Sequence, residues 1–499
     1  MIFKRKLRVV LALFALMIAI PIGIIINEKV SGSRRLEKAR AAYIADGGSF
    51  DPSSRLASPV PDEENFAAIP ALIGITKKDA DGEAIRAELG KLAFTDLSDP
   101  WPLKKANRKD KRQPHQPRRP IDLAPVQEFF VKNGLLLAPP DPSTLAKSLS
   151  DAYESTHGAK LTEIRAARNR ASAVFLPLSS EVNQPGARLI DETKPELQTG
   201  LEIAKGFKIH GLLALRSGKQ EIALADIETM QKLAHCVDND GKSLLSHLVS
   251  IAIHRMALDL VWEGMKSRSW SAPQLERLQA CLDTRSLRTN LADAFHAETL
   301  IVDELMENLS HNLYPSNETH RLLSPWIGHN RAHLIELHHQ AIIIPLMTSN
   351  GYAQAKVKSE AMLRDLTETW RFNPRTLFTK VCAPAVISTA VNTTSTTDAE
   401  LAQAAAACAL ERYYLSSQSY PDKLEDLVPD FAEAIPVDPI NSNPLHYQKT
   451  ADGRYQLHSI GLDAIDHYGG GGDVTWNYQE ALPLPPKRER KSRRRRGKP

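Results

Sequence analysis

The residues best suited to bind an ion lie in a glycine-rich loop near the C-terminal end of the chain. Between Gly461 and Asp473 the sequence contains five glycines and the carboxylates of Asp463, Asp466 and Asp473. Ca²⁺ takes about six to eight carboxylate and carbonyl oxygens, and glycines let the backbone turn its carbonyls toward one centre. The loop therefore predicts a structural Ca²⁺ site on these aspartates. The alternative is a solvated loop whose aspartates form local turns.

A second candidate metal site is a histidine pair on a predicted helix. His329 and His333 are one helical turn apart, so both imidazoles lie on the same face, and Glu336 follows close by. Imidazole and carboxylate groups bind Zn²⁺ and other divalent ions. The residues do not follow the His-Glu-x-x-His order, so the pattern does not indicate a metalloprotease.

Motifs typical of catalysis are missing. The sequence contains no G-x-S-x-G, Walker A or dinucleotide-binding motif and no cysteine–histidine nucleophile pattern. Cys236, Cys281, Cys382 and Cys408 are scattered without C-x-x-C spacing, which argues against a zinc ribbon and a disulfide-rich scaffold. These observations favour a protein without enzymatic activity, although they leave catalysis open.

An apolar segment near the N-terminus is long enough to cross a bilayer. Residues 9–26 form an uninterrupted apolar run of 18 residues between Arg8 and the polar Asn27, and a membrane span needs about 20. A cleaved signal peptide usually has a shorter apolar core of about 7–15 residues. We therefore expect residues 1–30 to be a retained signal anchor. The basic residues before the run predict a cytoplasmic N-terminus, with the body outside, in the periplasm at a bacterial inner membrane.

Charge is strongly segregated along the chain of 499 residues, although its net charge is only +4. Residues 4–8, 104–119 and 487–498 together carry a net charge of +19, so the remainder carries about −15. We interpret residues 31–125 as a mostly irregular, Pro-rich basic tether, and residues 479–499 as a disordered basic tail. Contact with anionic lipid, cell-wall polymer or nucleic acid is the alternative, and a nucleic-acid partner is not favoured.

The middle of the chain has the periodicity of an all-α domain, which we place at residues 126–395. Apolar residues recur about every 3.6 positions, and Ser217-Gly218 separates two such segments as the turn of a helical hairpin. A hydrophobic content of 42% suits a folded core, and a mean hydropathy of −0.30 excludes a protein with many membrane spans. The predicted helices include residues 221–235, 244–265, 291–309, 328–337 and 352–370.

Residues 396–478 have the pattern of a small α+β module. Thr397 and Glu400 have the spacing of a capping box, which predicts a helix start. After residue 429 come short β-type segments at 445–447 and 455–459, and the turn residues 451–453 between them indicate an antiparallel hairpin. A last short strand is expected at 474–476. The fold class is thus mainly α, with a small C-terminal α+β module and one N-terminal transmembrane helix.

Four short motifs in this module are similar to those of a known family. They are Tyr420-Pro421, Asp438-Pro439, Pro444-x-x-Tyr447 and Ser459-x-Gly461-x-Asp463, in that order. In this order they resemble the C-terminal module of the major pseudopilins of type II secretion. The resemblance implies an α+β fold and a Ca²⁺-binding loop, with Asp463, Asp466 and Asp473 as the ligands.

The N-terminal region departs from that family. A pseudopilin has its apolar helix and processing site directly before the module, whereas here the apolar run lies some 370 residues upstream and the processing motif is missing. The layout resembles a group of single-pass bacterial membrane proteins, of no assigned activity, that place such a module after a helical domain. Assembly into a fibre is therefore not implied.

The leading hypothesis is a membrane-anchored extracytoplasmic interaction or scaffold protein whose helical domain binds protein partners. A second hypothesis is a component of a type II secretion or pilus-like assembly system. A third is a metal-dependent periplasmic enzyme that uses His329, His333 and Glu336. Apart from Ca²⁺, no cofactor is expected.

Overall fold

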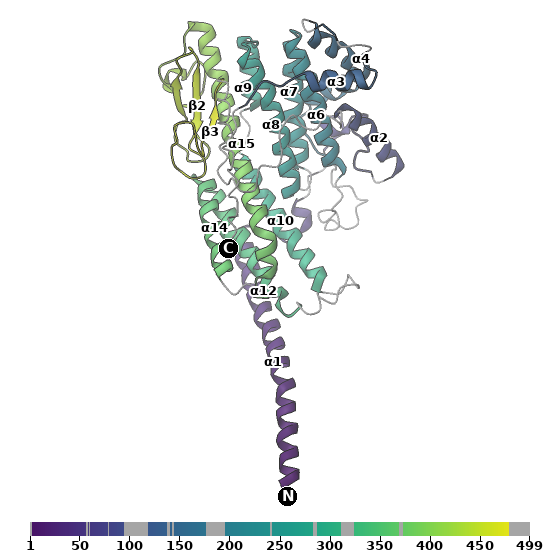
Figure 1. Ribbon diagram of the computed structural model, residues 1–499, viewed down its shortest axis with the longest axis vertical. Helices are drawn as coiled ribbons and strands as arrows, with labels where there is room; N and C mark the ends of the chain where they lie inside the picture. The colour runs from purple at the N-terminus through teal and green to yellow at the C-terminus, as the bar shows by residue number, and fades with distance from the viewer. Residues whose placement is uncertain are drawn as a thin grey trace, which may run out of the picture.

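The protein is mainly helical, with a small sheet near its C-terminal end, in the computed structural model (Figure 1). The predicted basic tail and most of the predicted basic stretch at 104–119 lie outside the described residues. The structure describes residues 2–55, 58, 60–77, 79–93, 118–136, 140–141, 144–175, 195–239, 242–282, 287–310, 324–368 and 373–478, without the side chains of residues 2–16, 18, 309, 310, 367, 368 and 382.

The first half of the described chain contains α1, which projects from the body, and the helices of one end of the body (Figure 1). Their bounds are α1 Ile2–Ala45, α2 Ala80–Gly90, α3 Ala124–Lys132, α4 Leu145–Ala166, α6 Pro195–Arg216, α7 Gln220–Asn239 and α8 Leu244–Lys266.

The second half contains the remaining helices and the strands. Their bounds are α9 Ala272–Leu282, α10 Leu287–Ser310, α12 Ile327–Glu336, a π-helical segment Leu337–Ile343, α13 Ile344–Leu346, α14 Gly351–Glu368, α15 Leu377–Ser417, β1 His446–Lys449, β2 Tyr455–Ser459 and β3 Val474–Trp476.

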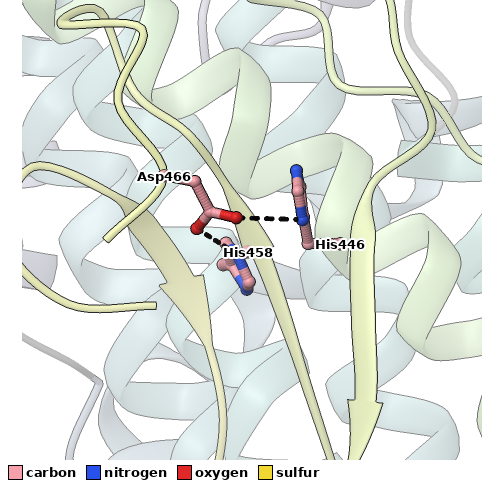
Figure 2. Close-up of side chains that lie close together, drawn as sticks. All are labelled: His446, His458 and Asp466. Carbon is pink, nitrogen blue, oxygen red and sulfur yellow. Dashed lines mark hydrogen bonds and ion pairs between the residues drawn. The ribbon is translucent and has the colours of Figure 1, made fainter. Parts of the chain in front are cut away.

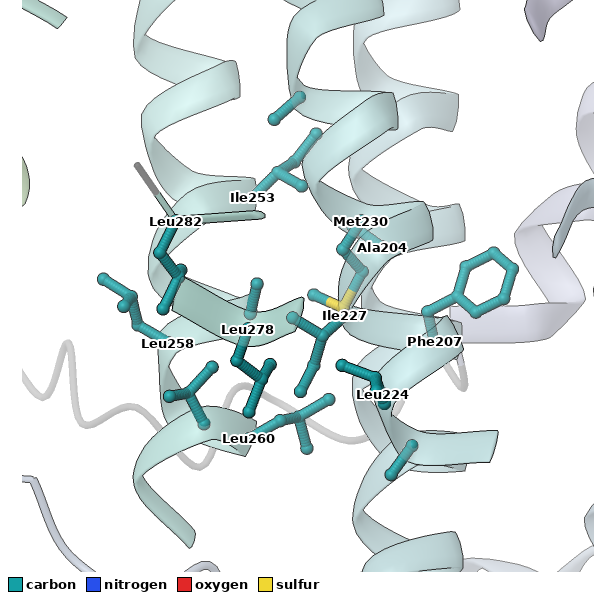
Figure 3. Packing of buried hydrophobic residues seen from close by; sticks show 14 of the residues in the cluster. Ala204, Phe207, Leu224, Ile227, Met230, Ile253, Leu258, Leu260, Leu278 and Leu282 are labelled. Carbon is teal, nitrogen blue, oxygen red and sulfur yellow. The ribbon is translucent and has the colours of Figure 1, made fainter. Parts of the chain in front are cut away.

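The larger hydrophobic core lies among α6, α7, α8, α9 and α15, and Figure 3 shows part of it. Ile227 of α7, Leu258 of α8 and Leu278 of α9 are each fully buried. Such contacts arise because apolar residues three and four positions apart form one stripe along each helix. Burying one leucine or isoleucine contributes about 1.5–3 kcal/mol. The helices predicted at 221–235 and 244–265 are confirmed, and α7 extends a few residues further at its C-terminal end.

The smaller core joins the C-terminal part of α1 to α10, α12 and α14. Ala39 and Tyr43 of α1 are buried with Phe295 of α10 and Ile335 of α12. The expectation of irregular structure from residue 31 onward is therefore wrong for residues 31–45, which continue α1 without a break. The physical reason is that Ala39 and Tyr43, four positions apart, lie on one helix face and find an apolar partner surface.

Two further parts of the predicted tether also belong to the folded body. Phe66 and Leu72 are buried in the larger core, and α2 packs on α6. Arg118, from the end of the basic stretch, forms ion pairs with Asp259 and Glu400 and is only 6% exposed. These contacts could not be predicted because each partner lies far away in the sequence.

The helix α15 crosses the expected boundary between the helical domain and the C-terminal module. Thr397 and Glu400, expected to cap a helix start, lie inside this helix of 41 residues and are buried. Thr394 Oγ1 is 3.0 Å from Nε2 of His247 on α8, so a polar helix–helix contact takes the place of a junction. The two predicted domains therefore share α15.

The three predicted strands are present, with β1 shifted by one residue at its start, and they form an antiparallel sheet in the order β1-β2-β3. The predicted hairpin is confirmed. The buried face of the sheet is formed by Tyr455, Leu457 and Trp476, which belong to the larger core. The sheet packs on α15, and the indole Nε1 of Trp262 on α8 donates a hydrogen bond of 2.9 Å to the carbonyl of Asn477. The sheet is thus fixed to the helical body.

Among the described residues, α8 has the length and hydropathy of a membrane-crossing helix. Within the fold, 61% of the apolar 18-residue stretch of α8 is buried, and α8 packs against α6, α7, α10 and α15. We therefore interpret α8 as a core helix of the body.

Candidate functional site

The β1–β2 hairpin brings two histidines together. His446 of β1 lies directly opposite His458 of β2 in the antiparallel register, and directly opposed side chains lie on the same face of a sheet. Their imidazole rings stack with centroids 4.5 Å apart and an angle of 22° between the planes. His458 is 7% exposed and His446 is 40% exposed.

Asp466, from the glycine-rich loop, reaches both histidines (Figure 2). Its Oδ1 lies 3.1 Å from Nε2 of His458, and its Oδ2 lies 3.5 Å from Nδ1 of His446. The backbone N–H of Tyr468 donates a hydrogen bond of 2.7 Å to Oδ1, which turns the loop back on itself at this point. Ligand atoms of His446, His458 and Asp466 all lie within 4.8 Å of one another.

Electrostatics favour the metal-binding forms of His458 and Asp466. Burial lowers the pKa of His458, and the neighbouring charge of His446 lowers it further. The hydrogen bond from the Tyr468 N–H lowers the pKa of Asp466, and contact with His458 adds to this. A neutral imidazole beside an ionised carboxylate is the state in which both bind a metal ion.

The other two aspartates of the loop have different partners. Asp473 is buried, and its Oδ2 accepts hydrogen bonds from the backbone N–H groups of His467 at 3.0 Å and Gly469 at 2.8 Å. Asp463 is 38% exposed, with Oδ2 3.9 Å from Nε2 of His467. His467 thus lies between Asp463 and Asp473, whereas Asp466 is bound to the histidine pair.

The three aspartates expected to bind Ca²⁺ are therefore divided between two neighbourhoods. Ca²⁺ prefers a shell of oxygen ligands, whereas the nearest side chains of Asp466 are imidazoles. The donor set around Asp466 does not fit Ca²⁺. Calcium binding by Asp463 and Asp473 stays a prediction.

The second candidate metal site, formed by His329, His333 and Glu336 on α12, faces α1. Arg35 donates to Glu336 with its Nη2 at 2.6 Å and its Nε at 3.3 Å, and its guanidinium also lies 2.8 Å from Nε2 of His333. Burial and then the charge of Arg35 lower the pKa of His333 to about 4. Because a guanidinium already lies against these groups, the geometry gives them no support as a metal centre.

The third residue of that set, His329, takes part in a neighbouring contact with α1. Its Nε2 is 3.4 Å from Oε2 of Glu28, and Arg375 donates to both oxygens of Glu28 at 2.8 and 2.5 Å. Five residues beyond Arg35 along α1, Arg40 is 3.0 Å from Asp303 of α10. We call the three ion pairs Glu28–Arg375, Arg35–Glu336 and Arg40–Asp303 the α1 clamp.

Sequence reasoning missed the pairing of His446 with His458, although a signal for it was present. The predicted hairpin turn is centred on Asp452, and the two histidines lie six residues before and six after it. Equal distances from the centre of a tight hairpin place two residues opposite each other. The role of Arg35 gave no comparable signal, because its partner lies 301 residues away.

A cleft lies beside the glycine-rich loop. It has a volume of about 440 Å³, within the size range of ligand sites. Arg255 and Lys356 contribute positive charges and Asp463 a negative one, and Asn392 and Thr393 of α15 add uncharged polar groups. Apolar side chains also line it, from Ile440, Leu462 and Val474.

Comparison with known proteins gave no match to a family model, to a curated protein or to a solved structure.

Proposed function

We propose that this protein is a single-pass membrane protein that holds a rigid, extracytoplasmic scaffold at a fixed position above a bacterial inner membrane. The observation that carries the proposal is the continuity of α1. One helix of 44 residues has an apolar N-terminal part outside the body and a polar C-terminal part fixed to the body (Figure 1).

The apolar part of α1 supports the membrane assignment. Met17, Ile20 and Ile26 are 64%, 53% and 58% exposed, and further isoleucines between them are similarly exposed. Exposing such side chains to water is unfavourable by about 1.5–3 kcal/mol each. An 18-residue helix is about 27 Å long, close to the hydrocarbon thickness of about 30 Å. A bilayer would cover this surface.

The α1 clamp supports the assignment of a rigid scaffold. It begins at Glu28, two residues after the apolar run, and continues through Arg35 to Arg40. No flexible linker separates the membrane segment from the body over these residues, since α1 is helical to Ala45. The height and rotation of the body relative to the bilayer would then be set by the helix. The cleft beside Asp463 is our proposed contact site for a protein partner.

A second candidate function is a part in type II secretion or a pilus-like assembly. The observation that favours it is the packing of the antiparallel sheet on the C-terminal part of a long helix, α15, together with the pseudopilin-like motifs. A strain that lacks the whole protein would then lose export of specific substrates. An unchanged secretome would refute this candidate.

Membrane retention of charge variants tests the leading proposal. Met17 and Ile44 are both exposed residues of α1, at 64% and 55%, but only Met17 lies in the apolar run. A lysine near the middle of a membrane helix costs about 2.5–3.5 kcal/mol. Met17→Lys should therefore reduce the fraction that resists alkaline extraction of membranes, whereas the matched control Ile44→Lys should not. Equal retention of the two variants would contradict the proposal.

A further inference from the structure

We propose that His446, His458 and Asp466 bind one divalent transition-metal ion of the zinc class, which joins the glycine-rich loop to the β1–β2 hairpin. This site differs from the calcium set expected from the sequence, with which it shares only Asp466. It is also separate from the His329–His333–Glu336 set on α12. The proposal does not depend on whether the chain crosses a membrane.

The spacing of the donor atoms fits such an ion. Zinc–nitrogen and zinc–oxygen bonds of about 2.0–2.2 Å in a tetrahedral arrangement place neighbouring ligand atoms about 3.4 Å apart. Oδ1 of Asp466 lies 3.1 Å from Nε2 of His458, and its other oxygen, Oδ2, lies 3.5 Å from Nδ1 of His446, so each oxygen has about this spacing from one imidazole. The ligand atoms of the two histidines also lie within 4.8 Å of each other. A small rotation of the more exposed His446 side chain would bring its nitrogen into place.

The chemistry of the donors selects the class of ion. Two imidazoles and one carboxylate are a typical donor set for Zn²⁺ and other late first-row metals, whereas Ca²⁺ and Mg²⁺ prefer oxygen ligands. Among the described residues, no lysine or arginine forms an ion pair with Asp466; its ion pairs are with the two histidines. The carboxylate charge can therefore be balanced by a bound cation.

The burial of His458 fixes the direction of one donor atom. Its side chain is 7% exposed, and its Nε2 lies 3.1 Å from Oδ1 of Asp466. Because a buried side chain has few other rotamers open to it, Nε2 would meet the ion without a large conformational change.

The position of the site suggests what the ion would do. His446 and Asp466 are 40% and 32% exposed, so the three protein ligands would leave a coordination position open on the solvent side. Asp466 belongs to the loop, whereas both histidines belong to the hairpin. The ion would therefore hold the loop in place and present an open position to water or to a ligand from a partner.

Metal binding by the purified full-length chain in detergent tests the proposal, with a tag that lacks histidine. The wild-type chain should bind one equivalent of Zn²⁺ in competition with a chromophoric chelator, and Co²⁺ should give the absorption bands of a four-coordinate site. His446→Ala and Asp466→Asn should each weaken the Zn²⁺ affinity measured in this competition by about tenfold or more. Both variants should also lose the Co²⁺ bands.

His467→Ala is the matched control, since His467 lies in the same loop, is 33% exposed and contacts Asp473. It should leave Zn²⁺ affinity and the Co²⁺ spectrum unchanged, and an equal loss in this control would overturn the assignment. Equal Zn²⁺ binding by wild type and His446→Ala would do the same. Ca²⁺ that displaces Zn²⁺ at comparable concentration would show that the loop binds an oxygen-preferring ion instead.

Discussion

Asp303 provides a quantitative test of how α1 is held. It is 3% exposed and lies on α10, where it accepts two hydrogen bonds from Arg331 of α12, at 2.7 and 3.0 Å. Arg40 of α1 lies 3.0 Å from the same carboxylate. Asp303 thus connects three helices, and Asp303→Asn removes its charge while nearly preserving its size.

The structure sets the size of the expected effect. Removing one partner of a buried ion pair costs about 3–5 kcal/mol, because the remaining charge stays buried. Arg331 is 7% exposed and retains Glu307 at 3.1 Å, which places Asp303→Asn at the lower end, about 3 kcal/mol. Arg40 is 35% exposed, so solvent screening limits the loss in Arg40→Gln to less than about 1 kcal/mol.

Urea unfolding of the full chain in detergent measures these differences. The slope of unfolding free energy against urea concentration is taken as common to all variants. The double variant Asp303→Leu with Arg331→Met should recover most of the stability lost in Asp303→Asn, because apolar replacement of a buried pair is often neutral. The reasoning is refuted if Asp303→Asn costs no more than Arg40→Gln, or if the double variant is less stable than Asp303→Asn.

Three further predictions concern other parts of the fold. Arg35→Ala removes the contact with Glu336, and because Arg35 is 36% exposed, amide hydrogen exchange in residues 31–45 should accelerate by up to about fivefold, as for a loss of up to about 1 kcal/mol; unchanged exchange would show that this ion pair does not hold α1. Burial alone lowers the pKa of His210, but hydrogen bonds and charges from Asp226 and Glu154 outweigh it and raise the pKa above 6.5. The stabilisation by His210 is therefore complete below 6.5 and is lost as pH rises through the folded-state pKa, and His210→Gln should flatten this part of the curve of unfolding free energy against pH. Leu278→Ala, in the larger core, should cost about 2–5 kcal/mol in the same urea assay, and a cost below 1 kcal/mol would contradict the packing in Figure 3.

Local patterns predicted the elements of the fold well, because helices and strands are encoded in short-range periodicity. The strand at 455–459 and the helix from residue 244 agree with the structure. The capping box predicted at Thr397 failed because residues before it pack against other helices, so the helix continues through a polar sequence. Tertiary contacts overrode a local helix-start signal there.

The site could be predicted only in part. Asp466 was identified from the composition of its loop, but its histidine partners were not, since their proximity depends on strand register. His333 and Glu336 were correctly expected to lie together on a helix. Their partner, Arg35, could not be predicted because it comes from a segment far away in the sequence.

The central claim, an anchor that holds the body outside the cytoplasm, is tested most directly by thiol labelling in spheroplasts. Ser53→Cys places an exposed thiol in the body just after α1, and Lys4→Cys places one before the apolar run. A membrane-impermeant maleimide should label Ser53→Cys above the background of the parent chain and label Lys4→Cys only after lysis. Labelling of Lys4→Cys in intact spheroplasts, or protection of Ser53→Cys, would contradict the account.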